Sequence, residues 1–381
     1  IEAELAALEA DSKRVGTQGG EIDFALLVDG LAAEREQGIT IDVAYRFFST
    51  DRRKFIVADT PGHEQYTRNM VTGASTANLA IILIDARKGV LTQSRRHAYL
   101  ASLVGIPHLV VAVNKMDLVD YSEDVFNRIR EEFEGFAARL NLRNVSYVPM
   151  SALHGDMVVG RGDNLSWYQG LPLLEILETI EIDHDINLDD LRFPVQWVCR
   201  PGTAEHHDFR GYMGRVESGS VKAADEVTVL PSGRSTRVRE IATYGGPLAE
   251  AHAPQSVTLL LEDNIDISRG DMIVKKGDAP RVTREFTAMV CWLAEQPLDP
   301  RRKYLVKHTT RTVKAILSHP DYHVNINTLE QEAGAGSLRM NDIGEIRICV
   351  PQPLVVDRYA ENRATGSLIV IDETSNNTVA A

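Results

Sequence analysis

Cysteine is scarce in this sequence, with only three residues among 381. Cys199, Cys291 and Cys349 lie far apart, their number is odd, and none belongs to a C-x-x-C pair. This pattern argues against a disulfide framework and against a cysteine-based zinc site. It is typical of buried thiols in a reducing compartment.

The sequence also lacks long apolar runs and an excess of positive charge. No stretch approaches the roughly 18 uncharged apolar residues of a membrane span, and the first residues do not form a basic signal sequence. The formal net charge of -13 argues against a broad nucleic-acid footprint, which needs clustered Lys and Arg. We therefore expect a cytoplasmic protein without a membrane or nucleic-acid partner.

The remaining composition is that of a folded protein. Hydrophobic residues make up 44% of the chain, and 381 residues exceed what one hydrophobic core usually spans. A chain of this length predicts two or three domains.

The first half of the chain alternates strand-like and helix-like segments, which is typical of a parallel sheet with crossover helices. Three predicted strands end at the polar residues Asp59, Asp85 and Asn114. Ligands of open α/β sheets bind beyond the carboxyl ends of the strands, so we expect Asp59 and Asn114 to face one crevice. The predicted strands are 39–47, 54–58, 79–84, 109–113 and 144–150. Among these, 79–84 and 109–113 are apolar runs of the kind found in strands buried on both faces. The predicted helices are 64–74, 93–104, 122–140 and 173–182.

The pattern changes after the polar linker around residues 183–185. Short β-like segments separated by Gly and Pro follow, which predicts barrel or sandwich domains. We place the domain boundaries at 1–186, 187–281 and 282–381, the last two being all-β. The predicted β segments are 193–199, 212–217, 226–230, 237–243, 256–261, 285–293, 304–308, 310–317, 344–350 and 367–372.

Asp59-Thr60-Pro61-Gly62-His63 is the first segment that predicts chemistry. A carboxylate at a strand end can hold Mg²⁺, partly through water, while the following glycine allows close approach to a phosphate. Asp59 and Gly62 have this arrangement. Taken alone, the segment is equally compatible with an ordinary turn.

Asn114-Lys115-Met116-Asp117 is the second such segment. The Asp117 carboxylate can accept hydrogen bonds from two donors on a guanine edge, which adenine does not offer. The Lys115 stem would pack over the base, and Asn114 would brace the loop. Downstream, the turn that begins at Ser151-Ala152 would direct a backbone N–H to the guanine oxygen, although by itself it also fits a plain surface turn.

Thr40 and His63 complete the candidate residues. Thr40 follows a polar segment with a glycine hinge, so its hydroxyl can join a magnesium shell when a γ-phosphate is present. The alternative is a solvent-facing start of a hairpin. His63 follows the Gly62 turn and can orient an attacking water.

These motifs resemble one protein family. E-R-E-Q-G-I-T-I at 34–41, D-T-P-G-H, N-K-M-D and S-A-L, in this order and followed by β domains, resemble the translational GTPase superfamily, whose best known member is elongation factor Tu. Residues 26–31, 42–46, 64–70 and 354–359, with Thr365-Gly366, resemble one branch: the large, GTP-hydrolysing subunit of bacterial sulfate adenylyltransferase.

The resemblance implies the fold, the activity and the site residues. It implies an α/β P-loop-type GTPase domain followed by two β-barrel domains. GTP hydrolysis would be coupled to the formation of adenylyl sulfate and pyrophosphate from ATP and sulfate on a partner, the small adenylyltransferase subunit, as the first step of sulfate assimilation. The implied ligands are GTP or GDP and Mg²⁺: Thr40 and Asp59 for the metal, Gly62 for the γ-phosphate, His63 for the water, and Asn114, Lys115, Asp117, Ser151, Ala152 and Leu153 for the guanine.

One part of the family pattern has no match. No G-x-x-x-x-G-K-[ST] loop occurs in the sequence, although its backbone N–H groups would cradle the phosphates. The chain begins with Ile1, and we expect the loop and the first, central strand to lie upstream of it in a longer native protein.

Two other functions stay open at this point. One is a translation elongation factor-like GTPase that binds aminoacyl-tRNA. The other is a nucleotide-free scaffold with a vestigial pocket.

Overall fold

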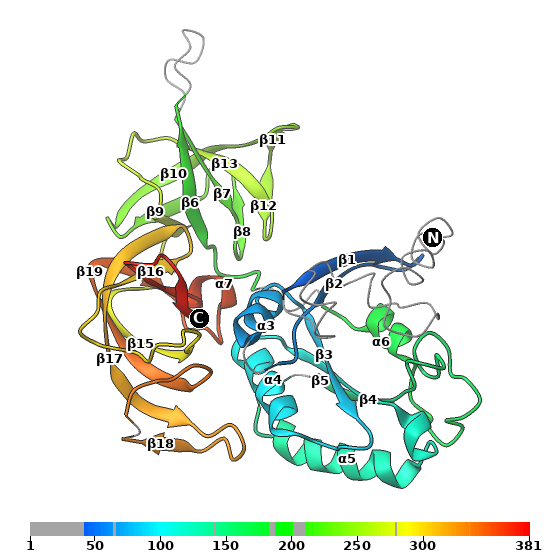
Figure 1. Cartoon of the computed structure of the whole chain (residues 1–381). Coiled ribbons are helices and arrows are strands. Elements are labelled where there is room, and N and C mark those ends of the chain that lie inside the picture. Colours follow the sequence, from blue (N-terminus) through cyan, green and yellow to red (C-terminus); the bar gives the residue numbers. More distant parts are fainter. Residues whose placement is uncertain are drawn as a thin grey trace, which may run out of the picture. The chain divides into compact units, whose positions relative to one another are not determined.

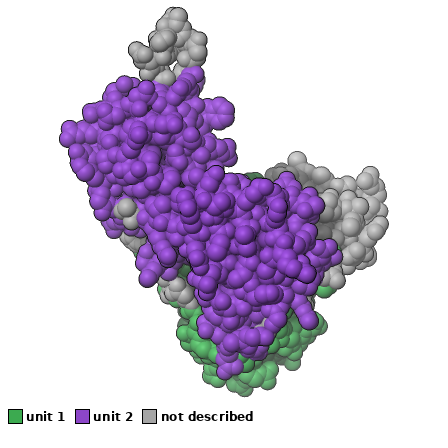
Figure 2. Space-filling model, turned by 90° about the vertical axis from the view of Figure 1, so that its left-hand side faces the viewer, with its two compact units in different colours: residues 1–182, 326–329 green, residues 183–325, 330–381 purple. Residues whose placement is uncertain are grey.

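The computed structural model describes residues 42–63, 66–140, 142, 144–182, 187–200, 210–278, 280–334 and 336–381. The chain forms two compact units, which Figure 2 colours separately. Unit 1 comprises residues 1–182 and 326–329, and unit 2 comprises residues 183–325 and 330–381. Within the described ranges, no helix has the length and apolar character needed to cross a membrane.

The centre of unit 1 is a parallel sheet with the order β3-β4-β5 (Figure 1). It consists of β3 (Leu79–Asp85), β4 (His108–Asn114) and β5 (Asn144–Pro149). The apolar residues of β4 are buried, as the sequence predicts. The same prediction is wrong for one face of β3: Ile81 and Leu83 are 40% and 61% exposed, whereas Ile82 and Ile84, on the opposite face, are buried.

A second difference concerns the strand that ends at Asp59. β1 (Ala44–Ser49) and β2 (Lys54–Asp59) form an antiparallel pair of their own, so the described strands do not make the single parallel sheet that was predicted. A tight connection suffices for antiparallel strands, whereas parallel strands need a crossover. The chain between β1 and β2 is only a short turn, in which the Thr50 N–H donates to the Arg53 carbonyl.

Helices link and cover these strands. The longest of those described, α5, begins after Ser122, whose hydroxyl accepts from the Val125 N–H at 3.4 Å, and its buried face contains Phe126, Ile129 and Phe133. The Ser122 cap and the helical spacing confirm the prediction for this segment. The described helices of unit 1 are α3 (Thr67–Ala74), α4 (Thr92–Leu103), the 3-10 helix η3 (Met116–Val119), α5 (Glu123–Ala137) and α6 (Leu173–Thr179).

One hydrophobic cluster joins the parallel sheet to α5. It contains Val110 to Val113 of β4, Phe126 and Phe133 of α5, and Met116, all nearly inaccessible to solvent. Burial of such side chains contributes about 1.5–3 kcal/mol each. The polar residues that follow the strands are therefore attached to a rigid support.

The described part of unit 2 contains two antiparallel seven-stranded sheets and a small two-stranded sheet, and the two large sheets have separate hydrophobic clusters. The first contains Phe193, Tyr212 and Leu259, and the second contains Trp292, Tyr304 and Ile348. The bounds are β6 (Phe193–Cys199), β7 (Gly211–Arg215), β8 (Ser220–Lys222), β9 (Glu226–Leu230), β10 (Arg234–Thr243), β11 (Gly246–Leu248), β12 (Glu250–His252), β13 (Ser256–Leu261), β14 (Met272–Lys275), β15 (Arg281–Cys291), β16 (Tyr304–His308), β17 (Arg311–Val324), β18 (Gln331–Ala333), β19 (Ile343–Val356), α7 (Arg363–Gly366), β20 (Ile369–Asp372) and β21 (Thr378–Ala380).

The sheets of unit 2 match the predicted all-β character of this half. The cluster of Leu230, Met272, Val274 and Val355 joins strands of both large sheets. The boundaries at 186/187 and 281/282 stay predictions. Cys291 is buried, whereas Cys199 and Cys349 are half-buried.

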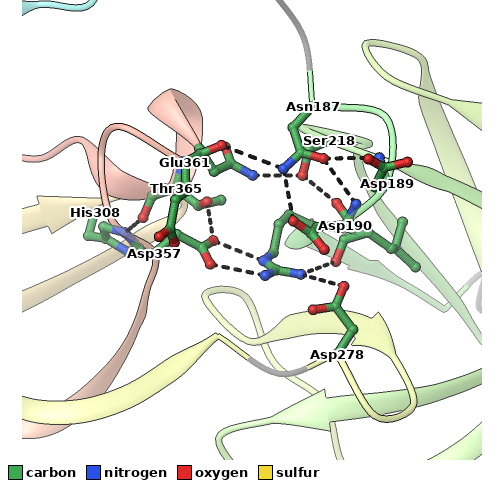
Figure 3. A network of polar contacts seen from close by, with 12 residues as sticks. Asn187, Asp189, Asp190, Ser218, Asp278, His308, Asp357, Glu361 and Thr365 are labelled. Atoms are coloured by element: carbon green, nitrogen blue, oxygen red, sulfur yellow. Dashed lines mark hydrogen bonds and ion pairs between the residues drawn. The ribbon is translucent and has the colours of Figure 1, made fainter.

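A polar network within unit 2 includes Asp278, Asp357 and Thr365 (Figure 3), and Arg192 is one of its donors. Its guanidinium donates to both carboxylate oxygens of Asp357, at 2.8 and 3.0 Å, and a further nitrogen lies 3.4 Å from Asp278. The side chains of Arg192 and Asp357 are 5% and 8% exposed. This bidentate ion pair joins residues that are 165 positions apart in the sequence.

Further hydrogen bonds surround this ion pair. Asn362 donates to Ser218 at 2.7 Å, and Ser218 donates to the Asp190 carbonyl at 2.6 Å. His308 Nε2 lies 2.7 Å from the Thr365 carbonyl oxygen, and burial lowers the pKa of His308. The buried charges therefore have partners, which compensates for their desolvation.

We expect Arg192→Met to lower the free energy of unfolding of unit 2 by about 3–5 kcal/mol, because the Asp357 carboxylate would remain buried without its guanidinium. The double variant Arg192→Met/Asp357→Leu should regain part of this loss. Urea unfolding, followed through the buried Trp292 in a Trp167→Phe/Trp197→Phe background, measures both. Lys276→Met, which breaks an exposed pair with Glu226, serves as the control. A double variant no more stable than Arg192→Met would contradict this account.

Candidate functional site

The register of the parallel sheet places two of the predicted strand ends side by side. Asp85, the last residue of β3, pairs with Asn114, the last residue of β4. The chain then turns at Lys115, whose backbone is left-handed with φ 64°, and enters η3. Met116 anchors this turn, because its side chain is fully buried and its N–H donates to the Met150 carbonyl at 3.2 Å.

Asn114 connects two loops. Its side-chain oxygen accepts from the Lys115 N–H at 2.7 Å and from the Ala152 N–H at 3.0 Å. The sequence predicts the bracing role of Asn114, but it assigns the N–H of the Ser151-Ala152 turn to the guanine oxygen. In this structure the Ala152 N–H donates to the Asn114 side-chain oxygen. A guanine oxygen would therefore share the Ala152 N–H with Asn114 or take the place of the Asn114 oxygen.

Asp117 is oriented by Ser151. The Ser151 hydroxyl donates to Asp117 Oδ1 at 2.7 Å and accepts from the His154 N–H at 3.3 Å. Ser151 is completely buried, whereas Leu153 is 80% exposed. The carboxylate at the predicted base-reading position is thus held by a serine from a loop 34 residues downstream.

Asp156 supports this loop and was not among the predicted site residues. Its carbonyl accepts from the Ser151 N–H at 3.2 Å, and its carboxylate accepts from the Tyr121 hydroxyl at 2.9 Å and from Asn164 at 3.0 Å. Burial and the neighbouring Asp156 raise the pKa of Tyr121. No local motif marks Asp156, because its partners come from separate loops.

Asp85 is the second residue that the sequence did not assign to the site. Its carboxylate accepts from the Arg87 guanidinium at 2.6 and 3.0 Å, and its Oδ2 lies 3.2 Å from Lys115 Nζ. The Arg87 side chain is the main cause that holds the pKa of Asp85 well below its usual range. The sequence feature that could have assigned Asp85 to the site is its position as a polar residue at the end of a predicted strand.

The predicted magnesium end lies on the β1-β2 pair. Asp59 is the last residue of β2 and is half-buried, and Gly62 and His63 are exposed. The His63 and Tyr66 rings are edge to face, with centroids 6.1 Å apart. Thr40 lies outside the described residues.

Two glycines determine how closely other groups approach this turn. A Cβ at Gly73 of α3 would lie 2.5 Å from Thr60 Cγ2, so only glycine lets α3 pack this closely against the end of β2. A Cβ at Gly62 would meet no described atom within 4 Å. Among the described residues, none therefore blocks the close approach to Gly62 that a phosphate contact requires.

The structure thus joins five of the predicted residues, Asn114, Lys115, Asp117, Ser151 and Ala152, through hydrogen bonds that connect the ends of β4 and β5. Asp59, Gly62 and His63 occupy the separate β1-β2 region, which contacts α3, while α3 contacts α4 and α4 contacts β3. In the part of the chain that the structure describes, no group of three or more His, Cys, Asp or Glu could hold a metal. A magnesium ion bound mainly by water and phosphate needs only one or two carboxylates, so Asp59 fits this requirement.

Family comparison defines the class of protein. Residues 4–183 match the elongation factor Tu GTP binding domain, and residues 285–381 match the GTP-eEF1A C-terminal domain-like family. The chain therefore contains a GTP-binding domain of the translational GTPase type followed by a β-rich C-terminal region. This confirms the predicted fold class, and it supports guanine-nucleotide binding.

Whole-chain relatives identify the branch. The chain is 55% identical to sulfate adenylyltransferase subunit 1 of Alteromonas mediterranea, covering 100% of this chain and 80% of the relative. It is 56% identical to the protein of the same name from Chromobacterium violaceum, with 100% and 79% covered. The chain belongs to the sulfate adenylyltransferase subunit 1 family, which confirms the family resemblance inferred from the sequence motifs.

Two further similarities were found. The bifunctional enzyme CysN/CysC of Mycobacterium tuberculosis is 54% identical over 100% of this chain, and this chain spans 62% of that protein's length. A crystal structure of sup35 complexed with GMPPNP aligns with 99% of this chain and 90% of that chain, at 20% identity and a TM-score of 0.47. The latter similarity supports no functional argument.

We expect Asp117→Asn to shift the base preference from guanine toward xanthine. An amide offers a donor where the carboxylate offers only acceptors, and xanthine has an oxygen where guanine has its 2-amino group. Competition of GDP and XDP against a fluorescent nucleotide measures the preference. An unchanged preference for GDP would contradict the assignment of Asp117 to the base.

Proposed function

We propose that this protein is the GTPase subunit of a sulfate adenylyltransferase. GTP hydrolysis on this chain is coupled to the formation of adenylyl sulfate and pyrophosphate from ATP and sulfate on a partner catalytic subunit. The observation that carries the proposal is the 55% identity over the whole chain to a protein named sulfate adenylyltransferase subunit 1. The words "subunit 1" support a partner, which we propose to be the small adenylyltransferase subunit.

The geometry of unit 1 supports the nucleotide part of this proposal. Asp117 is held by Ser151 and would accept from the guanine edge, and the Lys115 stem would pack against the base plane. The Asn114 oxygen fixes both loops before the nucleotide binds. A preorganised pocket loses less conformational freedom on binding, which increases affinity.

The magnesium end has fewer supporting contacts. We propose that Asp59 and Thr40 belong to the Mg²⁺ shell and that Gly62 contacts the γ-phosphate. When bound, Mg²⁺ would neutralise charge on the β- and γ-phosphate oxygens. We assign no residue to the phosphate cradle, because the sequence contains no Gly-rich phosphate loop.

His63 is the proposed water-positioning residue. Its exposed ring follows Gly62, at which an added Cβ would meet no described atom within 4 Å. Its imidazole would hold the attacking water in line with the γ-phosphate and would require no covalent intermediate.

The translation-factor alternative has weaker support. The whole-chain relatives at 53–56% identity carry sulfate adenylyltransferase or CysN/CysC names, and the net charge of -13 argues against a tRNA-sized nucleic-acid footprint.

A partner-dependent GTPase assay tests the proposed function. We expect the full-length protein, mixed with the small adenylyltransferase subunit, to hydrolyse GTP faster when ATP and sulfate are both present. The matched control omits sulfate. Stimulation by ribosomes instead of sulfate, or tight binding of aminoacyl-tRNA, would contradict the proposal.

We expect His63→Ala to reduce kcat for GTP hydrolysis by about 100-fold and to leave the Kd for GTP nearly unchanged. Orientation of water contributes in the transition state and little in the ground state. Single-turnover hydrolysis and nucleotide titration measure the two quantities. His252→Ala, at an exposed position in unit 2, is the control. A parallel loss of affinity and rate would refute this role.

A further inference from the structure

Asp85 brings an additional carboxylate to the base end of the proposed pocket. The parallel register of β3 and β4 sets Asp85 directly beside Asn114, and the Ala86 N–H donates to the Asn114 carbonyl at 2.9 Å. The position of Asp85 is therefore determined by the sheet and does not depend on a mobile loop.

Two cations converge on this carboxylate. Arg87 binds both oxygens of Asp85, at 3.0 Å and 2.6 Å, and its backbone N–H donates to Oδ1 at 3.0 Å. Lys115 Nζ lies 3.2 Å from Oδ2. The Asp85 side chain is only 17% exposed, whereas those of Arg87 and Lys115 are 47% and 48% exposed.

The same two cations are linked to a second carboxylate, that of Asp117. Lys115 is two positions before Asp117 in the chain. The pKa of the Arg87 guanidinium is raised mainly by Asp85 and to a smaller extent by the charge of Asp117. A cation bound to Asp117 would occupy an acceptor that the guanine 2-amino group requires. Ion pairs of long side chains on a protein surface rearrange easily, because each exposed pair is worth about 0–1 kcal/mol.

We propose that Asp85 is a positioning residue of the guanine pocket: it holds Arg87 and Lys115 so that neither cation neutralises Asp117. Asp85 does not touch the base itself, and it acts through the two cations. Its contact with Lys115 also fixes the stem of that side chain at the base end. This inference rests on the proposed nucleotide-binding function and adds a determinant of base specificity.

Comparison of GDP with IDP tests the proposal. Inosine lacks the 2-amino group, so the ratio of GDP affinity to IDP affinity measures how much the hydrogen bond from this group to Asp117 contributes to binding. We expect Asp85→Asn to lower GDP affinity about tenfold, as for loss of a hydrogen bond to a charged group, and to reduce the GDP-to-IDP ratio at least about threefold. Glu132→Gln, which breaks the exposed Arg95–Glu132 pair of the same unit, should leave both values unchanged.

Second-site variants separate positioning from a purely structural role. Asp85→Asn/Arg87→Gln and Asp85→Asn/Lys115→Met each remove one of the released cations, so each should recover part of the ratio. A structural defect would not be corrected in this way. Recovery in neither double variant would overturn the proposal.

One single variant keeps the proposal testable even if Asp85→Asn does not fold. Arg87→Gln leaves Asp85 with Lys115 to hold, so the GDP-to-IDP ratio should stay within about twofold of wild type. A loss of the ratio in this variant would overturn the proposal. Absence of GDP binding by the wild-type protein would refute the proposed function itself, whereas normal GDP binding with an unchanged Asp85→Asn ratio would refute only the role of Asp85.

Discussion

The proposed nucleotide end of this protein depends on the hydrogen bonds accepted by the Asn114 side chain. One oxygen atom ties the left-handed turn at Lys115 to the loop at Ala152. Both loops follow buried strands, and the underlying support is the apolar β4 packed against Phe126 and Phe133 of α5. Because the loops are joined before any ligand binds, Asp117 and Ser151 meet in a defined geometry, and the chemistry of the site follows from that contact.

Charge distribution refines the same site. Asp85, Arg87 and Lys115 form an ion-pair cluster at neighbouring strand ends, next to the carboxylate that would read the base. Asp85 can keep the nearby cations away from Asp117 only if Asp85 attracts these cations more strongly than Asp117 does. The low exposure of Asp85 and its three contacts with Arg87 favour the stronger attraction by Asp85.

In unit 2, the central feature is the set of contacts that join its two large sheets. Each of its two large sheets has its own hydrophobic cluster, so each could pack independently, yet the Arg192–Asp357 pair and the cluster around Val355 join them. Burying such an ion pair contributes little net stability, but breaking it costs much more. The network therefore opposes separation of the two sheets more than it stabilises either one.

The sequence by itself determined the local features: the α/β and all-β halves, the Ser122 helix cap, the strand ends at Asp59, Asp85 and Asn114, and the family-specific motifs. These depend on periodicity, capping and residue type, which are encoded within short segments. Only the tertiary structure decided that β2 pairs with β1 outside the parallel sheet, that the Ala152 N–H binds Asn114, and that Asp85 holds Lys115. The reason is that pairing, burial and ion-pair partners depend on residues distant in the chain, such as Asp117 and Ser151, and no local pattern specifies which of several polar groups will meet.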